Sequence, residues 1–405
     1  MNEQEIRRWL REDDPRRLEE LWHAADQARR RCVGDAVHLR ALVEISSFCV
    51  RRCGYCGLRA PRSALERYRM SAQEVLQCAE QARGLGCGTV VLQSGEDPAI
   101  TMEWAEDLIR RLRSAAPELA ITLSLGERTE EELLAWKRAG ADRYLLRFET
   151  SNRRLYSRIH PPLPGSRPDR IAILRMLRRM GYEVGSGVMI GIPGQTYEDL
   201  ARDIEFFVEL ELDMIGVGPY IPHPDTPLGR IAAARSRRRE SPAASTRTTH
   251  GTGGQGPAPA PADWDHVHVP PPPGPDEQVP ASEEMTCKVI ALARLVRPHA
   301  NIPSTTALAT LNRHDGRELG LLRGANVVMP NQTPVKYRRL YEIYPNKACV
   351  SESPADCGGC LDRRIRAIGR QIGTGRGDAR RHGPHDIDGA VACRVVCGKP
   401  RRPTP

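Results

Sequence analysis

The sequence predicts an α/β protein built as a (β/α)8 TIM-type barrel, with N-terminal helices and a C-terminal extension. Eight short apolar segments alternate with segments of helical period along the 405 residues. Alternation of this kind is typical of a parallel sheet covered by helices. The predicted strands also end in polar residues, such as QSGED, RFET and MPNQTP. In a parallel barrel these strand ends meet at one mouth, where active sites lie.

The individual elements follow from these periods. Two helices are predicted first, over residues 3–12 and 15–32. Strands are predicted over residues 41–45, 88–93, 120–125, 143–149, 185–191, 213–218, 300–305 and 325–329. The helices between them are predicted over residues 71–86, 103–115, 129–140, 169–181, 196–211 and 283–297. An open doubly wound sheet is the alternative, because periodicity does not show closure. No GxGxxG opens a helix after the first strand, which disfavours a dinucleotide fold.

Composition divides the chain into segments. We expect N-terminal helices over residues 1–38, the barrel over residues 39–346, a cysteine-containing segment over residues 347–370 and a basic tail over residues 371–405. Residues 231–282 interrupt the barrel with Arg-rich and Pro-rich sequence, including VPPPPGPDEQVP. Such a composition cannot bury a core, so we expect this insertion and the tail to be disordered.

The net charge of +9 is unevenly distributed. Residues 229–250 carry +5 and residues 361–405 carry +7, so the rest of the chain carries −3. A nucleic-acid-binding protein would place its basic residues on an ordered face with interleaved aromatics. Aromatic residues make up only 5% of the chain, and the basic runs lie in the segments expected to be disordered. Nucleic-acid binding is therefore the weaker hypothesis, from a different class of function.

The N-terminal sequence and the cysteine content bear on the compartment. MNEQEIRRWLREDDPRR has no apolar stretch of the kind found in a signal peptide, and its acidic residues disfavour a transit peptide. No apolar run reaches the roughly 18 residues of a membrane helix. We expect a cytoplasmic protein whose twelve cysteines are metal ligands or core thiols rather than disulfides.

Three cysteines stand close together directly after the first predicted strand. Cys49, Cys53 and Cys56 form a C-x3-C-x2-C triplet in ISSFCVRRCGYCGLR. Three thiolates can bind three irons of a [4Fe–4S] cluster and leave the fourth iron open for a substrate or cofactor. Zinc is one alternative, although structural zinc takes four ligands and no fourth lies nearby. A metal-free loop is the other, although three exposed thiols would be prone to oxidation.

This spacing, with Tyr55 before the last cysteine, resembles the radical S-adenosylmethionine (SAM) superfamily. Longer segments are similar to the HydE family within it, in the family's order across about residues 20–365. They include VVLQSGEDP, GADRYLLRFET, GSGVMIGIPGQTYEDL, LDMIGVGPYIPHPDTPL, IPSTTALATL and GANVVMPNQTPVKYRRLYEIYPNKACV. Biotin synthase and methylornithine synthase share the cysteine loop, but QSGEDP, IPHPDTPL and MPNQTP favour HydE. The insertion at 231–282 departs from the family pattern.

The resemblance implies an activity and its partners. The cofactors would be a [4Fe–4S] cluster and SAM, which is cleaved reductively to a 5′-deoxyadenosyl radical. The role would be maturation of the [FeFe]-hydrogenase H-cluster, acting on an iron–CO–CN–cysteine complex made by HydG. The product would pass to HydF, and the reductant would be ferredoxin or flavodoxin.

Candidate SAM ligands follow the later strands. Arg147 and Glu149 alternate in RFE, so both side chains should point to the same face. A glutamate can accept from ribose hydroxyls and an arginine can hold a carboxylate, whereas a structural ion pair is the alternative. The resemblance places SAM near these two residues and Arg170. It completes the cofactor-binding set with Tyr55, Gln93, Ser94, Gly95, Glu96 and Ser124.

The resemblance also implies a substrate cavity and a second metal site. The cavity would be lined by Met214, Thr305, Thr306, Met329, Tyr341 and Tyr344, for which an ordinary barrel interior is the alternative. A second triplet, Cys349, Cys357 and Cys360, has C-x7-C-x2-C spacing. An auxiliary iron–sulfur cluster would fit it, with zinc or no metal as alternatives. We expect Cys32, Cys78, Cys87 and Cys287 to be core thiols.

Overall fold

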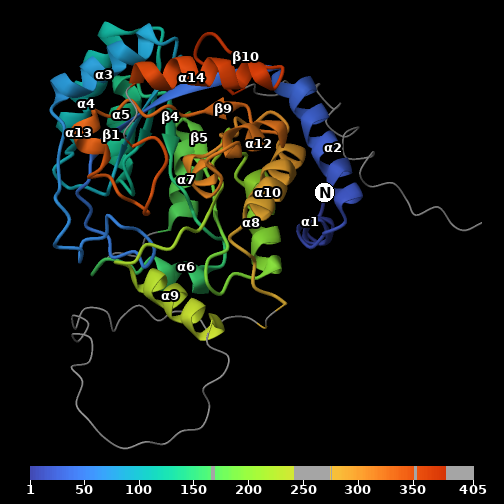
Figure 1. The fold of residues 1–405 in the computed structure, drawn as a ribbon. Helices are drawn as coiled ribbons and strands as arrows, with labels where there is room; N and C mark the ends of the chain where they lie inside the picture. Colours follow the sequence, from blue (N-terminus) through green and yellow to red (C-terminus); the bar gives the residue numbers. More distant parts are fainter. Residues whose placement is uncertain (166–168, 241–273, 275, 351–353, 380–405) are drawn as a thin grey trace, which may run out of the picture.

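A computed structural model describes residues 1–165, 169–240, 274, 276–350 and 354–379 (Figure 1). Helices α1 (Glu3–Leu10) and α2 (Pro15–Val33) come first. Asn2 opens α1 with a capping box, because its side chain accepts from the Glu5 amide while the Glu5 carboxylate accepts from the Asn2 amide. The apolar faces of both helices are buried, and they pack against helices α8 and α10 on the outside of the sheet.

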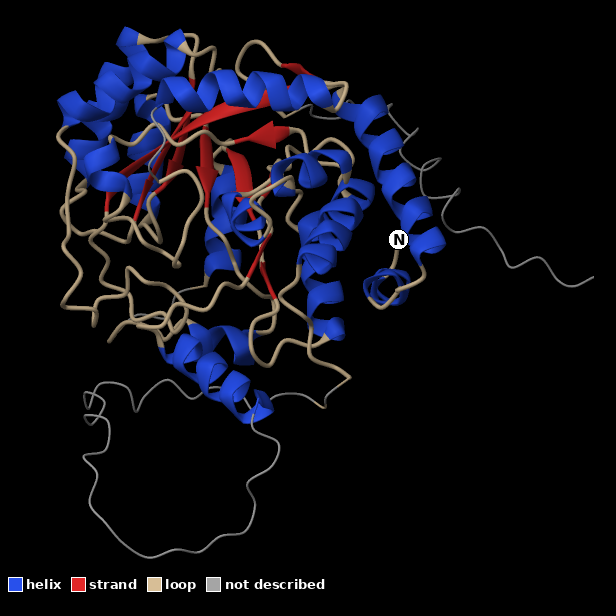
Figure 2. Cartoon of the chain, viewed as in Figure 1, coloured by secondary structure: helices blue, strands red, loops and turns tan. Residues whose placement is uncertain are grey.

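Parallel strands form the centre of the molecule, and helices surround them (Figure 2). The strands of the main sheet are β1 (Ala36–Ser46), β2 (Thr89–Ser94), β3 (Ala120–Ser124), β4 (Arg143–Leu145), β5 (Glu183–Ser186) and β7 (Met214–Ile215), in that order. Strand β9 (Val327–Val328) pairs with β1. Single parallel bridges from Met214 to Asn301 and from Pro303 to Val327 connect β7 to β9. The sheet therefore closes on itself, which confirms the predicted barrel.

The helices between the strands largely match those predicted. They are α3 (Ala72–Gly84), α4 (Met102–Ala115), α5 (Glu130–Ala139), α7 (Arg170–Arg179), α8 (Tyr197–Glu209) and α10 (Glu283–Val296). Shorter or additional helices are α6 (Arg153–Ile159), α9 (Pro227–Glu240), α11 (Thr306–Leu311), α12 (Gly316–Leu322), α13 (Val335–Arg338) and α14 (Pro354–Ala367).

Several predicted strands are shorter than expected. The strand predicted over residues 300–305 is present only as single bridges at Asn301 and Pro303, and the one predicted over 325–329 is reduced to β9. Strand β4 ends at Leu145 rather than residue 149, and Glu149 has a positive φ of 62°, outside the β region. The two predicted strands over residues 185–191 and 213–218 are each split, giving β6 (Met189–Ile190) and β8 (Gly218–Pro219) as a separate pair. The split falls where the two backbones approach closely, since a Cβ on Gly187 would lie 1.7 Å from the Gly216 carbonyl oxygen.

The segment after α14 is ordered and closes one end of the barrel. Strand β10 (Gln371–Ile372) pairs with the start of β1. The Gly377 carbonyl oxygen then accepts from Arg40 at 3.0 Å and from Asn301 at 3.1 Å, inside the barrel. The expectation of a disordered tail from residue 371 is therefore wrong for residues 371–379. Their backbone accepts hydrogen bonds from polar side chains inside the barrel. The composition of the tail does not reveal these distant partners. Residues 380–405 lie outside the described part of the chain.

The insertion is also ordered at both of its ends. Helix α9 extends to Glu240, and Gln278 accepts from the Gly194 amide at 2.8 Å. The expected disorder over 231–282 is thus wrong for these flanks, and residues 241–273 lie outside the described residues. In Figure 1, α14 and β10 lie over one end of the barrel, and α6 and α9 lie over the other.

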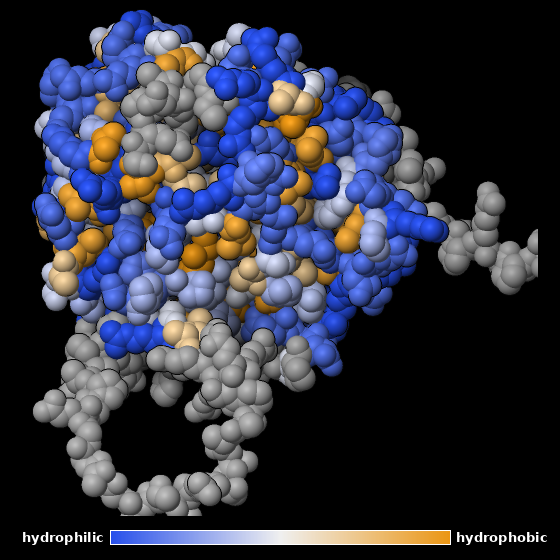
Figure 3. Space-filling view, in the orientation of Figure 1, coloured by the Kyte–Doolittle hydropathy of each residue, from blue (hydrophilic) through white to orange (hydrophobic). Residues whose placement is uncertain are grey.

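The outer surface is mixed in polarity. On the face shown in Figure 3, apolar side chains appear in separate groups between polar ones. None of the described helices combines the length and the apolarity that crossing a bilayer requires.

Candidate active site

The cysteine loop follows β1 at the C-terminal end of the barrel and is held there by backbone hydrogen bonds. The Val50 amide donates to the Glu96 carbonyl at 2.9 Å, after β2. The Gly54 amide donates to Ile159 of α6 at 2.8 Å, and the Gly57 amide donates to Ile343 at 2.9 Å. Three distant segments therefore fix the loop, which confines the three cysteines to one region of the mouth.

Of the three thiols, Cys53 is buried, and Cys49 and Cys56 are partly buried. Burial raises the pKa of Cys49, Cys53 and Cys56, to about 12 for Cys56, and their mutual repulsion adds to the shifts of Cys53 and Cys56. Within the described residues, no three Cys, His, Asp or Glu side chains are arranged like the ligands of a bound metal ion. The loop nevertheless suits a [4Fe–4S] cluster, because it offers three sulfur donors and leaves the fourth iron without a protein ligand.

The segment after β2 lies directly against this loop. A Cβ on Gly95 would lie 2.2 Å from the Phe48 carbonyl oxygen and 2.8 Å from Cys49 Cβ, so only glycine fits there. The Glu96 amide donates to Cys49 Sγ at 3.4 Å. The buried Ser94 hydroxyl has no hydrogen-bond partner among the described residues. The segment that was predicted to bind SAM thus contacts the loop that was predicted to bind the cluster.

Arg147 and Glu149 contact each other in an ion pair, although they follow β4 and do not alternate along it as predicted. Arg147 Nη2 lies 3.1 Å from Glu149 Oε2 and 2.6 Å from the Val188 carbonyl oxygen. Glu149 is buried, yet Oε2 accepts no hydrogen bond from the described chain. Its φ of 62° is a strained conformation, and such strain clusters at functional sites. The ion pair with Arg147 holds this carboxylate in place, and a buried oxygen that accepts no hydrogen bond within the described chain can still accept one from a ligand hydroxyl.

Arg170 belongs to a chain of alternating charges that the sequence did not reveal. Its Nε donates to Glu127 at 2.8 Å, and Glu127 also lies 2.6 Å from Arg51 Nη2. Arg51 in turn pairs with Glu96 at 2.7 Å. Burial alone would raise the pKa of Glu127, but its contact with His160 and the charges of Arg170 and Arg51 lower it to about 2. The only sequence signal was the position of Glu127 in SLGERT, after the third strand.

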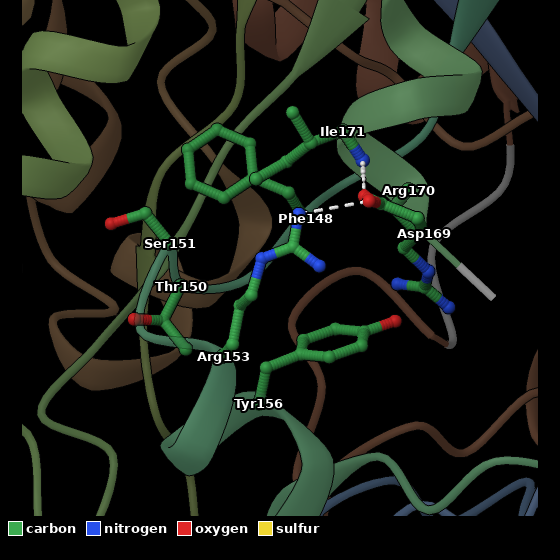
Figure 4. Close-up of a pocket in the computed structure, with 8 residues that line it drawn as sticks. All are labelled: Phe148, Thr150, Ser151, Arg153, Tyr156, Asp169, Arg170 and Ile171. Carbon is green, nitrogen blue, oxygen red and sulfur yellow. Dashed lines mark hydrogen bonds and ion pairs between the residues drawn. The ribbon is translucent and has the colours of Figure 1, made fainter. Parts of the chain in front are cut away.

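A small pocket opens beside Arg170, between α6 and α7 (Figure 4). Asp169 closes part of it by accepting from Arg153 at 2.9 Å and from the Ile171 amide at 3.1 Å. The Arg170 guanidinium also lies 5.8 Å from the centroid of the Tyr156 ring. The residues lining the pocket are Phe148, Thr150, Ser151, Arg153, Tyr156, Asp169, Arg170 and Ile171.

The residues predicted to line a substrate cavity do not all lie at the same depth. Gln93 donates to the Tyr341 hydroxyl at 3.3 Å near the cysteine loop. Met214 lies deeper, with Sδ 2.8 Å from Arg40. Thr305 caps α11, and a Cβ on Gly218 would lie 3.3 Å from its hydroxyl. The other predicted cavity residues are partly buried, namely Thr306, Met329 and Tyr344.

Another buried pair was missed from the sequence. Lys347 Nζ lies 2.7 Å from Glu44 Oε1, both side chains are almost fully buried, and Lys347 also donates to the Tyr341 carbonyl at 3.1 Å. The pair therefore holds the Tyr341 segment against the end of β1. Its only signal was a lysine in YPNKACV, whose long-range partner cannot be identified from local sequence.

The second cysteine triplet is only partly described. Cys357 and Cys360 lie on α14, and their side chains fall outside the described part of the chain. Cys349 has a positive φ of 62°, and Arg317 Nη2 lies 2.7 Å from its sulfur. Among the predicted core thiols, Cys78, Cys87 and Cys287 are buried, whereas Cys32 is partly exposed.

Comparison with known proteins agrees with this architecture. Residues 43–207 match the radical SAM superfamily. A crystal structure of methylornithine synthase (PylB) superposes with a TM-score of 0.70 at 21% identity, over 92% of this chain and 94% of that one. A closed parallel barrel with a C-x3-C-x2-C loop at its mouth therefore defines a radical SAM enzyme, a class whose cofactors are a [4Fe–4S] cluster and SAM.

Sequence similarity narrows this class. The chain is 39% identical over 363 residues to the [FeFe] hydrogenase maturase subunit HydE of Thermotoga maritima, covering 90% of this chain and 89% of that protein. It is 25% identical over 233 residues to 3-methylornithine synthase of Methanosarcina acetivorans, covering 57% of this chain and 65% of that protein. The chain belongs to the HydE family of radical SAM enzymes.

Proposed function

We propose that this protein is an [FeFe]-hydrogenase maturase that cleaves SAM reductively and uses the resulting radical on an iron–CO–CN–cysteine precursor of the H-cluster. The observation that carries this proposal is the 39% identity to the Thermotoga maritima maturase over nearly the whole length of both chains. A biotin synthase-like or methylornithine synthase-like activity is less well supported, since the similarity to 3-methylornithine synthase covers only 57% of this chain.

The residues at the mouth would each have a separate role in binding the cofactors. Cys49, Cys53 and Cys56 would hold the [4Fe–4S] cluster, which supplies the electron for SAM cleavage when bound. Glu149 would accept hydrogen bonds from the ribose hydroxyls through Oε2, which pairs with Arg147 but accepts no hydrogen bond from the described chain. Arg170 would hold the SAM carboxylate, because a guanidinium offers several donors in a fixed plane.

The barrel interior supplies the space for the substrate. Tyr341 is buried and oriented by Gln93, so it would form the boundary between the SAM side and the deeper cavity. Thr305 and Thr306 would donate hydroxyl hydrogen bonds to an anionic or metal-bound group, with Met329 and Tyr344 alongside. Enclosure by the barrel would keep water away from a reactive radical.

The partners follow from the same family membership. HydG would supply the iron complex, HydF would receive the product, and ferredoxin or flavodoxin would reduce the cluster in the cytoplasm. A second iron–sulfur cluster on Cys349, Cys357 and Cys360 would be an accessory to this chemistry.

An in vitro maturation assay tests the proposal. Apo-[FeFe]-hydrogenase, HydG, HydF, SAM and a reductant are combined without HydE, and this protein is then added. We expect hydrogenase activity to appear with the wild-type protein and not with Cys53→Ala. SAM cleavage without hydrogenase activation would mean that the enzyme has a different substrate.

A further inference from the structure

A buried histidine contacts one of the three predicted cluster ligands. His160 ends α6 and is 1% exposed, and its Nδ1 lies 3.0 Å from Cys53 Sγ. Cys53 is itself the most buried of the three cysteines in the loop. The backbone strengthens this placement, because the Gly54 amide next to Cys53 donates to the Ile159 carbonyl, next to His160. The end of α6 and the middle of the cysteine loop are therefore fixed to each other.

The other ring nitrogen faces two groups of opposite charge. His160 Nε2 lies 3.2 Å from Arg170 Nη2 and 3.3 Å from Glu127 Oε1. Arg170 Nε also donates to Glu127 Oε1 at 2.8 Å, so the guanidinium bridges the carboxylate and the ring. A guanidinium can only donate hydrogen bonds. When Nε2 accepts from Arg170, the single proton of the neutral ring is therefore on Nδ1. That proton then points at the Cys53 sulfur.

The alternative tautomer fits only a protonated thiol. With the proton on Nε2, the ring would donate to Glu127 and Nδ1 would accept from the Cys53 S–H. A cysteine that binds iron is a thiolate and has no proton to give. Two lone pairs would then face each other across 3.0 Å, so a bound cluster favours the Nδ1–H tautomer.

We propose that His160 is a positioning residue that donates a hydrogen bond from Nδ1 to the Cys53 sulfur of the cluster, with Arg170, which is itself held by Glu127, selecting its tautomer by donating to Nε2. This inference rests on the cluster site of the proposed function and adds a specific donor to it. Hydrogen bonds to ligand sulfurs stabilise the reduced, more negative cluster and raise its reduction potential. His160 therefore makes the cluster easier to reduce.

A redox titration of anaerobically reconstituted protein, monitored by EPR without SAM, tests this role. His160→Phe keeps a ring but removes both nitrogens, whereas His160→Asn keeps an N–H near the position of Nδ1. We expect His160→Phe to lower the ratio of reduced to oxidised cluster about tenfold at a fixed potential, equivalent to about 59 mV for a one-electron couple. His160→Asn should retain most of the wild-type potential.

A matched control separates the hydrogen bond from loop packing. His223 is also 1% exposed and packs on the same loop, since a Cβ on Gly57 would lie 2.7 Å from its ring. His223→Phe should leave the potential at the wild-type value, because no described contact joins His223 to a cysteine sulfur. An equal shift in His223→Phe and His160→Phe, or equal potentials in all variants, would overturn the inference while leaving the proposed function intact.

A second measurement needs no variant. Pulsed EPR of the reduced wild-type cluster, with and without ¹⁵N-histidine labelling, should show a weak nitrogen coupling that changes with the label. A cluster without any such coupling would also overturn the inference. Absence of a cluster from the reconstituted wild-type protein would overturn the proposed function together with it.

Discussion

The two ends of the barrel interior both carry buried charges, but they pair these charges differently. At the N-terminal end, Arg143 donates to Glu183 at 2.6 Å, to Thr89 at 2.8 Å and to Asp378 at 2.6 Å. At the C-terminal end, Glu149 Oε2 lies 3.1 Å from the Arg147 guanidinium but accepts no hydrogen bond from the described chain. A charged group whose nitrogens all donate within the chain, like Arg143, indicates a structural role, whereas a buried acceptor with an unused hydrogen-bonding position indicates a ligand.

The same contrast appears in how each end is covered. Residues 371–379 fold against the N-terminal end, where Gly377 and Asp378 meet Arg40 and Arg143. The C-terminal end is bordered by the cysteine loop instead, where Cys53 lies 3.0 Å from His160 and Cys49 accepts from the Glu96 amide. One end is thus filled by the chain itself, and the other is arranged to receive a cofactor.

The largest expected effect is at the cysteine loop. Cys53→Ala should lower SAM cleavage by at least about a hundredfold, because the loss of one ligand removes a corner of the cluster. The measurement is 5′-deoxyadenosine formation by anaerobic, reduced protein. Cys287→Ala provides the control, since this thiol is buried in α10 away from the loop. Equal rates in Cys53→Ala and wild type would contradict the cluster assignment.

The next largest effect concerns stability at the opposite end. Arg143→Met should lower the free energy of unfolding by about 3 kcal/mol, since it leaves Glu183 without its buried partner. Chemical denaturation measures the change. SAM affinity should stay at the wild-type value in the folded protein. A loss of SAM affinity as large as that expected of Glu149→Gln would contradict the idea that the N-terminal end has only a structural role.

Glu149→Gln should weaken SAM binding by about tenfold to a hundredfold, because a hydrogen bond to a charged acceptor contributes about 1.5–3 kcal/mol. Isothermal titration of the cluster-loaded protein measures the dissociation constant. The matched variant is Glu183→Gln, which removes the same charge at the N-terminal end. An equal loss of affinity in both variants would argue against a ribose contact by Glu149.

The smallest effect is a pH dependence close to the mouth. Burial raises the pKa of Asp203 to about 7, although hydrogen bonds from Ser151 and Thr150 oppose the shift. A carboxyl with a raised folded pKa stabilises the protein below its unfolded pKa, near 3.8, and that stabilisation is lost as the pH rises through 7. Between pH 5 and pH 7 the wild type should lose about 2 kcal/mol relative to Asp203→Asn. Parallel stability curves for the two proteins would refute this assignment.

The features that could be predicted from the sequence are those set by residues close together in the chain. The parallel barrel and the position of the cysteine loop after its first strand follow from periodicity and spacing, and the structure has them. The strand predicted over residues 143–149 ends at Leu145, and Glu149 beyond it has a positive φ, a backbone angle that an alternating pattern does not encode.

Long-range pairing escaped prediction. His160 is 107 residues from Cys53, and Lys347 is 303 residues from Glu44, so no local pattern joins them. Residues 371–379 have a Gly-rich, polar composition that resembles a disordered tail. They are ordered because side chains of the barrel donate hydrogen bonds to their backbone. Arg143 donates to the Arg376 carbonyl, and Asn301 donates to the Gly377 carbonyl.

The central claim is that the C-terminal end of the barrel binds a [4Fe–4S] cluster with one iron open to SAM. EPR of the reduced, reconstituted protein before and after SAM addition tests it most directly. We predict a [4Fe–4S]⁺ signal whose g-values shift when SAM is added, and a loss of that shift in Glu149→Gln at the same SAM concentration. A signal that SAM leaves unchanged in the wild type would contradict the claim.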